Sequence, residues 1–347
     1  MNGHGRFVGV VMLVVLVLVA GLGTGASAQQ LPKAVAIGTN TPGTLFYSLA
    51  AGLAKVISEG SPIQGTVQPY AGTSTLVPLV NTGELDFGLV NGVDMGLAYV
   101  GPQKLSVGGR NPFPHVPNTR LVIRGAPLML APIVRKDSPI KTVHEIRGKR
   151  VTGEYPAHLA VWYNMFGILS SAGLTWQDVR VVPVPAVNEG MDALIQGRAD
   201  VSTHALGSAK VKEADATVGI RYVSIDCSPQ GEHRLRTAVP GYYPRLLKAG
   251  VSTGVVEDTC FIAYDIYFIT HKAAPDHVVV AVVKAILDNA QKLPPLHPSF
   301  REWTRDRVAS ADVTIPYHPG AIKFYKEQGL WKPEMDQAQQ RLLALNP

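Results

Sequence analysis

Apolar and polar positions alternate along the chain in a pattern that predicts strands and helices in turn. The apolar residues 34–37 (AVAI) predict a buried strand, and residues 45–60 (LFYSLAAGLAKVISEG) have the periodicity of an amphipathic helix. A strand at 65–70, a short helix at 76–83 and a strand at 86–91 follow. Strands that alternate with helices are typical of parallel βαβ units, so this part of the chain predicts an α/β fold.

The same layout returns after a shift of 114 positions, without a gap. The coinciding residues are Pro42 with Pro156, Leu45 with Leu159, Val67 with Val181, Pro69 with Pro183, Gly83 with Gly197 and Asp86 with Asp200. This repeat predicts two similar α/β halves. In open α/β sheets a ligand lies beyond the carboxyl ends of the strands, so two such edges that face each other would form a cleft.

Two long strand-like stretches, residues 124–139 and 257–272, stand on either side of the second half and predict the two crossovers of a hinge. A mature chain of about 319 residues exceeds what one core usually fills. We therefore expect domain I to contain residues 29–132 and 259–347, and domain II to contain residues 133–258.

The C-terminal run 315–331 (IPYHPGAIKFYKEQGLW) predicts a helix over Gly320–Gln328 that ends at Gly329. We interpret this run as an element that closes domain I, and a surface that docks on a permease is the functional alternative. His318 lies far along the sequence from the candidate cleft loops, which argues against a catalytic role.

The N-terminus has the composition of a secretory signal peptide, since Arg6 precedes an apolar run at residues 7–22 and the small-residue site Ala26-Ser27-Ala28. We expect cleavage after Ala28 and export to the periplasm. A membrane anchor is the alternative, but the run is short for a span of about 20 residues.

Charge and cysteine content limit the possible functions. Removal of residues 1–28 lowers the formal charge from +6 to +5, and no Lys/Arg block is present, which argues against nucleic-acid binding. In an oxidising compartment Cys227 and Cys260 can form a disulfide, with two buried free thiols as the alternative. No His/Cys spacing typical of a metal site occurs, so we expect no metal and no cofactor.

Two polar loops and one strand end in the first half predict a binding site. The loop at residues 38–44 (GTNTPGT) precedes a helix, where backbone N–H groups and hydroxyls suit a carboxylate or phosphate. A similar loop lies at residues 71–75 (AGTST), and a third strand ends at Asn91. All three converge on one sheet edge, although loops of this composition are often plain turns.

The matching loop of the second half, residues 153–158 (GEYPAH), carries larger polar groups. Tyr155 could stack on a ligand and His158 could donate a hydrogen bond, whereas Glu154 would repel an acid. His204 ends a strand near the same edge, and a buried structural role is its alternative. Sequence patterns of serine hydrolases, zinc peptidases, P-loops and dinucleotide-binding folds are absent, so we expect no enzyme.

Several motifs resemble the TAXI family of solute receptors of TRAP transporters, over essentially the whole mature chain. The motifs are residues 36–57, residues 70–99, the run 145–151 followed by 172–182, and residues 315–331. The resemblance implies a periplasmic binding protein type II fold, in which two α/β domains joined by a two-strand hinge close on a small organic anion. It also implies delivery of that anion to a membrane permease.

By family position, the resemblance implies ligand binding by residues of domain I, which are Thr39, Asn40, Thr44, Tyr47, Thr73, Ser74 and Asn91. Asn91 stands where relatives often carry glutamine. The GEYPAH loop departs from the small-residue loop that the family usually has there, so the second half of the ligand would be contacted by different chemistry, and glutamate specificity does not transfer.

The leading hypothesis is therefore a monomeric, non-catalytic receptor that traps a carboxylate-bearing solute, with Tyr155, His158 or His204 completing the site on closure. Two alternatives remain open at the level of sequence. The chain could present its closed form to a membrane sensor kinase, or it could be a periplasmic enzyme that uses His158, Glu154 or His204.

Overall fold

The second α/β half repeats the first, element by element. The structure, a computed structural model, describes Met1 and residues 30–346, so the signal peptide expected at residues 1–28 lies outside the part that can be discussed. The first repeat contains β1 (Ala34–Asn40), α1 (Leu45–Gly60), β2 (Gln64–Tyr70), α2 (Thr73–Thr82), β3 (Phe87–Asn91) and α3 (Gly92–Val100). The second contains β5 (Arg150–Glu154), α4 (Leu159–Ser171), β6 (Arg180–Val184), α5 (Val187–Ile195), β7 (Ser202–Ala205) and α6 (Ala209–Val218).

The coinciding residues of the repeat make the same contacts in both copies. The Asp86 carboxylate accepts a hydrogen bond from the Ala36 N–H at 2.8 Å, and the Asp200 carboxylate accepts one from the Arg150 N–H at 2.9 Å. Gly83, with φ 79°, ends α2. Its equivalent Gly197, which follows α5, also has a positive φ, of 71°. Only glycine adopts this backbone region freely, which explains why both copies keep it. The repeat predicted from sequence is thus confirmed.

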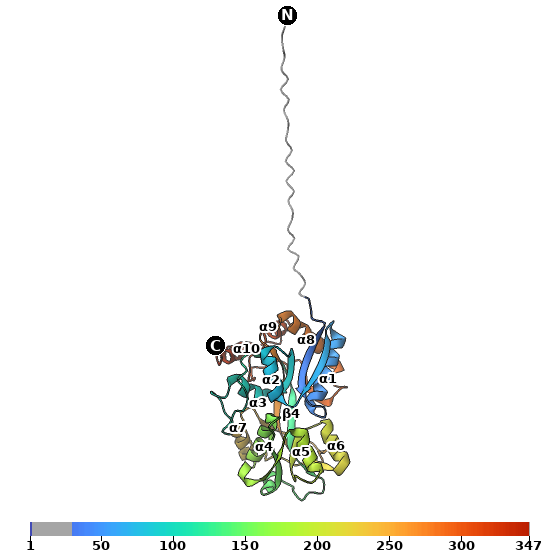
Figure 1. Cartoon of the computed structure of the whole chain (residues 1–347), viewed down its shortest axis with the longest axis vertical. Coiled ribbons are helices and arrows are strands. Elements are labelled where there is room, and N and C mark those ends of the chain that lie inside the picture. Colours follow the sequence, from blue (N-terminus) through green and yellow to red (C-terminus); the bar gives the residue numbers. More distant parts are fainter. Residues whose placement is uncertain (2–29, 347) are drawn as a thin grey trace. The chain divides into compact units, whose positions relative to one another are not determined.

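Two long strands connect the repeats (Figure 1). They are β4 (Thr119–Arg135) and β10 (Thr259–His271), which pair antiparallel with each other. The main sheet has the order β2-β1-β3-β10-β4-β7, with β8 (Ile220–Tyr222) on β4 and β9 (Tyr243–Leu247) on β10. Strands β5 and β6 form a separate two-stranded sheet. The expected crossovers are confirmed, and the fold is that of a periplasmic binding protein of type II.

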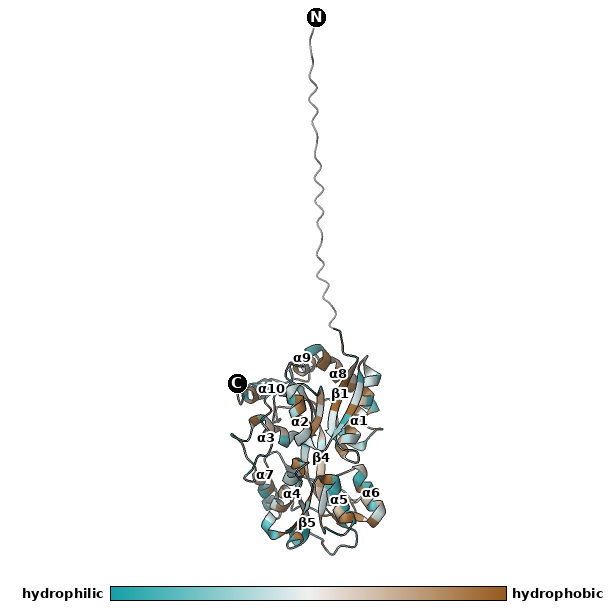
Figure 2. Cartoon of the chain, in the orientation of Figure 1, coloured by the Kyte–Doolittle hydropathy of each residue, from teal (hydrophilic) through white to brown (hydrophobic). Residues whose placement is uncertain are grey.

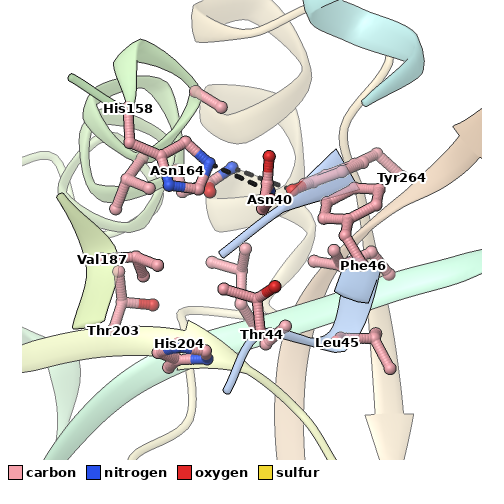
Figure 3. A pocket seen from close by; sticks show the side chains of 15 residues that line it. Asn40, Thr44, Leu45, Phe46, His158, Asn164, Val187, Thr203, His204 and Tyr264 are labelled. Atoms are coloured by element: carbon pink, nitrogen blue, oxygen red, sulfur yellow. Dashed lines mark hydrogen bonds between the residues drawn. The ribbon is translucent and has the colours of Figure 1, made fainter. Parts of the chain in front are cut away.

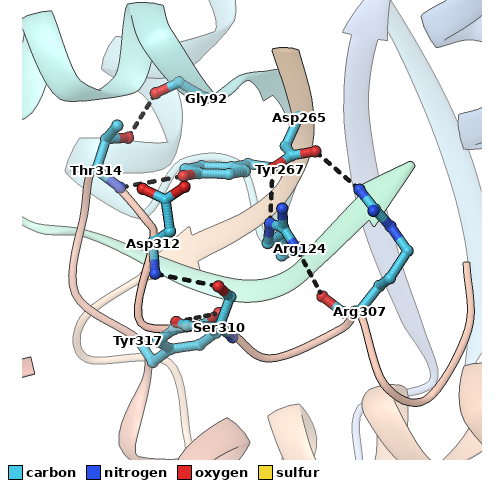
Figure 4. A network of polar contacts seen from close by, with 9 residues as sticks. All are labelled: Gly92, Arg124, Asp265, Tyr267, Arg307, Ser310, Asp312, Thr314 and Tyr317. Atoms are coloured by element: carbon cyan, nitrogen blue, oxygen red, sulfur yellow. Dashed lines mark hydrogen bonds and ion pairs between the residues drawn. The ribbon is translucent and has the colours of Figure 1, made fainter. Parts of the chain in front are cut away.

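An ion-pair network fastens β4 to β10 where their register shifts. Of the two register shifts between these strands, one lies between Asp265 and Tyr267. The Asp265 carboxylate accepts from Arg124 Nε at 2.6 Å and from Arg307 at 3.0 Å, and all three side chains are mostly buried (Figure 4). Tyr267 accepts from the Thr314 N–H at 3.0 Å on the other side of the strand. This network ties the C-terminal segment to both long strands.

The C-terminal segment covers the first repeat. It contains α8 (Asp276–Asp288), α9 (Pro319–Glu327) and α10 (Pro333–Leu343). In α9 Tyr325 is fully buried and donates to the Val122 carbonyl of β4 at 2.7 Å. His318 is the N-cap of this helix and accepts from the Gly320 N–H at 3.1 Å. The interpretation of residues 315–331 as a closing element is confirmed.

The remaining described elements are α7 (Pro229–Ala238) and four short 3-10 helices, at Val143–Ile146, Trp176–Asp178, Ala290–Lys292 and Pro298–Glu302. Cys227 and Cys260 form a disulfide with their Cα atoms 6.4 Å apart, which connects the segment before α7 to β10. Among the described residues no helix is long and apolar enough to cross a membrane.

Apolar residues form one core that continues through both repeats. The main cluster includes residues of β1, α1, β4, α4, β10 and α8. Of two smaller clusters, one lies within the second repeat and the other joins α5 and α6 to β4, β8 and β10. Figure 2 shows that α8 is more apolar than α6. The residues from Leu31 onward cluster as one compact unit. The division into domains at residues 133 and 259 therefore stays a prediction.

Candidate ligand-binding site

Three strand ends of the first repeat meet at one edge of the main sheet. β1 pairs in parallel with β2 and with β3, with Asn40 opposite Tyr70 and Gly38 opposite Gly88. β1 therefore ends at Asn40 beside the start of α2 and the end of β3. Each strand leads into the N-terminus of a helix, which carries a partial positive charge. The side chains of Thr44 and Asn91 cap α1 and α3 and accept hydrogen bonds from N–H groups of the first turn.

Side chains at this edge carry buried polar atoms that have no hydrogen-bond partner among the described residues. These atoms are Thr39 Oγ1, Asn40 Oδ1, Thr73 Oγ1, Ser74 Oγ, Asn91 Nδ2 and His158 Nδ1. Five of these residues come from the first repeat and one from the second. Buried polar atoms are normally paired, because leaving one unpaired costs about 1–3 kcal/mol. Their concentration in one place indicates a site that pairs with a polar ligand.

The two repeats touch each other directly at this edge. The Nδ2 of Asn40 lies 3.4 Å from the Nε2 of His158, which is the N-cap of α4. Gly72 lies so close to the opposite loop that a Cβ atom on it would stand 2.7 Å from the Ala157 carbonyl oxygen. Glycine is therefore needed at the start of α2 for this contact. The structure shows the cleft in a closed arrangement.

A small cavity of about 30 Å³ lies between the repeats, beside this contact. A volume of this size holds about one water molecule. Figure 3 shows side chains from both repeats and from β10 facing it. Its lining residues are Asn40, Thr44, Leu45, Phe46, Leu128, Leu130, His158, Ala160, Val161, Asn164, Val187, Thr203, His204, Ala205 and Tyr264. A solute larger than water does not fit into the cavity in this state, so the cleft must be more open when such a solute is bound.

Thr44 and Tyr47 occupy a structural position at the start of α1. The Thr44 hydroxyl donates to the Thr41 carbonyl at 2.7 Å and accepts from the Tyr47 N–H at 3.2 Å, so it is the N-cap of the helix. Thr44 lines the cavity, but its hydroxyl is already engaged. Tyr47 is half-buried and does not line the cavity.

His204 belongs to a polar chain that joins the two repeats. Its Nε2 lies 3.1 Å from Asn188 Oδ1, and its Nδ1 lies 2.7 Å from the Ser208 hydroxyl. The Asn188 amide also donates to the Thr41 hydroxyl at 3.3 Å and to the Pro42 carbonyl at 3.1 Å in the first repeat. Serine, histidine and amide in this order resemble a catalytic triad. Ser208 is fully buried and does not line the cavity. These hydrogen bonds therefore hold the two repeats together.

Tyr155 does not reach the cavity, contrary to the stacking role expected for it. Its side chain is fully buried, and its hydroxyl donates to Thr152 at 2.6 Å beneath the loop. The reason is the backbone, because Glu154 and Tyr155 have φ values of 68° and 49°. This left-handed turn, unusual for residues with side chains, directs the ring inward and leaves Glu154 exposed.

Both histidines of the cavity are neutral near neutral pH. Burial lowers the pKa of His158 to about 4. Burial, and after it the neighbouring His158, lowers the pKa of His204 to about 3. No lysine or arginine lines the cavity. Hydroxyls, amides, neutral imidazoles and helix N-termini are therefore the groups available to a ligand at this site.

Two residues of the site escaped the sequence reasoning. Asn164 and Tyr264 line the cavity, and Asn164 Nδ2 lies 3.5 Å from the Tyr264 hydroxyl and donates to Tyr242 at 2.6 Å (Figure 3). Asn164 is the single side-chain amide of the largely apolar helix α4. A lone amide among apolar residues was the feature of the sequence that could have pointed to this site. Among the described residues no cluster of His, Cys, Asp and Glu could hold a metal ion.

Comparison with known proteins identifies the family. The sequence model of the NMT1-like family matches residues 37–329. The chain belongs to the NMT1-like family. Every residue of the sheet edge and of the cavity lies inside the matched range. The closed cleft between the repeats is thus part of this NMT1-like domain.

Solved structures share the fold of this NMT1-like protein. One is a periplasmic transporter with a TM-score of 0.53 and 13% identity, over 90% of this chain and 97% of that chain. Another is PhnD1 from Prochlorococcus marinus in complex with methylphosphonate, with a TM-score of 0.53 and 10% identity, over 86% of this chain and 100% of that chain. At such identities the similarity establishes the fold.

Proposed function

We propose that the protein is an exported solute receptor that traps a small acid between its two repeats and delivers it to a membrane transporter. The observation that carries this proposal is the set of unpaired buried polar atoms from both repeats at the closed contact, above all Asn40 and His158. A site with such atoms on both sides of a hinge gains hydrogen bonds only when a polar ligand is present. The ligand therefore stabilises the closed form.

The acid group of the ligand would lie at the start of α1, α2 and α3, on the hydroxyls of Thr39, Thr73 and Ser74. Helix N-termini and hydroxyls bind anions without help from a cationic side chain. Thr39, Thr73 and Ser74 do not line the small cavity of the closed state, so the acid would reach their hydroxyls in a more open cleft. The cavity itself is lined by no lysine or arginine. The methylphosphonate in PhnD1 is likewise a small acid, held in a related fold. We propose a carboxylate as the acid, in keeping with the resemblance of the motifs to TAXI receptors.

Delivery to a TRAP-type permease rests on the same resemblance, and so does a monomeric state. The periplasmic location rests also on the signal peptide expected at residues 1–28, and the expectation of no cofactor rests on the lack of metal-site spacings in the sequence. A receptor needs no chemical step. The buried position of Ser208 supports a receptor over an enzyme, because this serine contacts the cavity histidine His204 but is out of reach of a ligand.

Thermal unfolding of the purified protein against carboxylates, sulfonates and phosphonates tests this function. A ligand that binds only the folded state at 100 times its Kd adds about 2.7 kcal/mol of stability, or roughly 5 °C in the midpoint. We expect such a shift with one class of small acid. No shift with any acid, at concentrations up to 10 mM as a rough upper limit for a receptor, would contradict the proposal.

A further inference from the structure

A second cavity, of about 290 Å³, lies on the other face of β4 from the small cavity. Leu128 and Leu130 line the small cavity. Pro127 and Met129 alternate with them along the strand, so they point to the opposite face, and both line the second cavity. We call it the rear cavity. Its volume is close to the lower end of the range for pockets that bind small molecules, about 300–1,000 Å³.

The walls of the rear cavity come from both sides of the hinge. One wall belongs to the second repeat and β9, and the other to the segment after α8. Arg245 of β9 donates to the Glu302 carboxylate at 2.9 Å. His297 Nδ1 accepts from the Ser299 N–H at 3.2 Å, so the proton is on Nε2, which donates to the Gly207 carbonyl at 3.1 Å. These contacts are made in the closed arrangement, so the shape of the rear cavity depends on how the two repeats are placed.

Positive charge gathers at the rear cavity. Lys212, Arg245 and Arg301 line it, and Glu302 is the one carboxylate among its lining residues. Arg245 is paired with Glu302. Lys212 and Arg301 are exposed, and neither has an ion-pair partner within residues 30–346. Charges of one sign around a recess of low polarity attract a counter-ion, so the rear cavity favours an anion.

The rest of the wall is largely apolar. Its apolar part consists of Leu45, Pro127, Met129, Leu206, Leu247 and Val251. Val251 is 55% exposed, so apolar surface continues from the interior of the cavity to its mouth. Apolar walls with a few charged groups are typical of sites for small molecules that carry one polar end. The rear cavity therefore suits a hydrocarbon chain inside and an acid group beside the exposed cations.

We propose that the rear cavity is a second binding site, for an amphiphilic anion that consists of an acid group on a short hydrocarbon chain, and that its occupant favours the closed cleft. The chain lies against Pro127 and Met129, and the acid group binds Lys212 and Arg301. Such a molecule bridges α6 and the segment after α8 in the placement that the closed state gives them. By linkage, the occupant and a solute in the cleft strengthen each other's binding. Only this coupling rests on the proposed function, and the site itself does not.

Hexanoate is a suitable probe, because it carries an acid group on a short chain. Acetate lacks the chain and hexan-1-ol lacks the charge. We expect isothermal titration to show binding of hexanoate, and binding of the other two compounds to be weaker by roughly 10-fold or more. No binding of hexanoate at concentrations up to roughly 10 mM, or equal binding of either control compound, would overturn the proposal.

Charge-matched double variants locate the probe in the rear cavity. Lys212→Gln with Arg301→Gln should bind hexanoate roughly 10-fold more weakly than the unmodified protein. The control, Lys323→Gln with Arg341→Gln, removes two exposed charges from α9 and α10 and should bind hexanoate fully. All four side chains are exposed, so we expect both double variants to fold. Equal affinity in the two double variants would overturn the proposal.

Asn91→Ala separates the rear cavity from the proposed acid site. This variant should keep its affinity for hexanoate, because Asn91 does not line the rear cavity. Loss of hexanoate binding in Asn91→Ala would place the probe in the cleft, which would overturn the second site and support the acid receptor. Hexanoate binding that survives Asn91→Ala, while no acid binds the cleft, would support the second site and contradict the proposed function.

Gly72→Val tests the coupling without a known solute. Gly72 lies too close to the opposite loop to accept a side chain, so this variant holds the cleft open. We expect hexanoate to bind Gly72→Val roughly 5-fold more weakly than the unmodified protein, since the closed arrangement of the rear cavity is lost. Equal affinity would show that the rear cavity does not depend on closure, and would overturn the coupling.

Discussion

Asn40 and His158 are 118 residues apart in the sequence, yet their side-chain nitrogens Nδ2 and Nε2 lie 3.4 Å apart in the closed cleft. Asn40 ends the first strand of one repeat, and His158 caps the first helix of the other. Each keeps one polar atom unpaired, Oδ1 in Asn40 and Nδ1 in His158. The contact thus closes the cleft without satisfying the groups that form it, which leaves hydrogen-bonding capacity for a solute.

Gly72 sets how closely the repeats approach. In Gly72→Val the new Cβ would stand 2.7 Å from the Ala157 carbonyl oxygen and 2.9 Å from the His158 Cα, so the variant holds the cleft open. We expect weaker solute binding and a larger radius of gyration in small-angle scattering, at an unchanged unfolding midpoint. An unchanged radius with full affinity would show that the contact at Gly72 is dispensable for closure.

The two cavity histidines predict a loss of stability in acid. Their pKa values in the folded protein, about 4 for His158 and about 3 for His204, lie below the value of about 6.5 in an unfolded chain. Between these values the unfolded state binds more protons, so stability is full above pH 6.5 and falls as pH decreases.

For each histidine we expect a loss of about 2 kcal/mol between pH 7 and pH 5. Chemical denaturation at both pH values measures it. The variant His158→Gln should show a smaller loss than the unmodified protein, because one titrating group is gone. Equal losses in the two proteins would contradict the assignment to His158.

The ion pairs of Asp265 stabilise the connection between β4 and β10. Asp265→Asn removes the charge that two mostly buried arginines share, and breaking such a pair leaves buried cations uncompensated. We expect the free energy of unfolding to fall by about 2–3 kcal/mol, less than for a fully buried pair, because these side chains keep some contact with solvent. The control is Glu232→Gln, which removes the exposed ion pair of Glu232 with Arg236 in α7. It should change the free energy of unfolding by less than about 0.5 kcal/mol. Similar losses in both variants would contradict a special role of Asp265.

The disulfide between Cys227 and Cys260 closes a loop with a sequence separation of 33. By loop-closure entropy, its removal costs roughly 3–4 kcal/mol. We expect Cys227→Ser to unfold at a lower denaturant concentration than the unmodified protein under oxidising conditions. Addition of a reductant should remove the difference between the two proteins, and a difference that persists would point to packing at residue 227 instead.

Much of the fold could be predicted because the repeat keeps residues that have backbone functions. Asp86 and Asp200 bind equivalent N–H groups, and Gly83 and Gly197 adopt positive φ, so their spacing reveals the two βαβ units. The edge with Thr39, Thr73 and Asn91 followed from the rule that strand ends of a parallel sheet meet. Sequence patterns carry this kind of local and topological information.

The rest of the site depends on side-chain direction, which the sequence does not show. Tyr155 points into the core because Glu154 and Tyr155 adopt left-handed φ, and neither position holds the glycine or asparagine that would mark this backbone region in the sequence. Asn164 and Tyr264 reach the cavity from a helix and a strand that read as apolar core.

The central claim is that the unpaired atoms at the closed contact bind the solute. Isothermal titration of the acid identified by thermal unfolding, with Thr39→Ala, Ser74→Ala, Asn91→Ala and the exposed control Thr217→Ala, tests it most directly. Each site variant should weaken binding roughly 5- to 50-fold, since a lost hydrogen bond to a charged group costs about 1–2 kcal/mol, and Thr217→Ala should bind as the unmodified protein does. Full affinity in all three site variants would contradict the account.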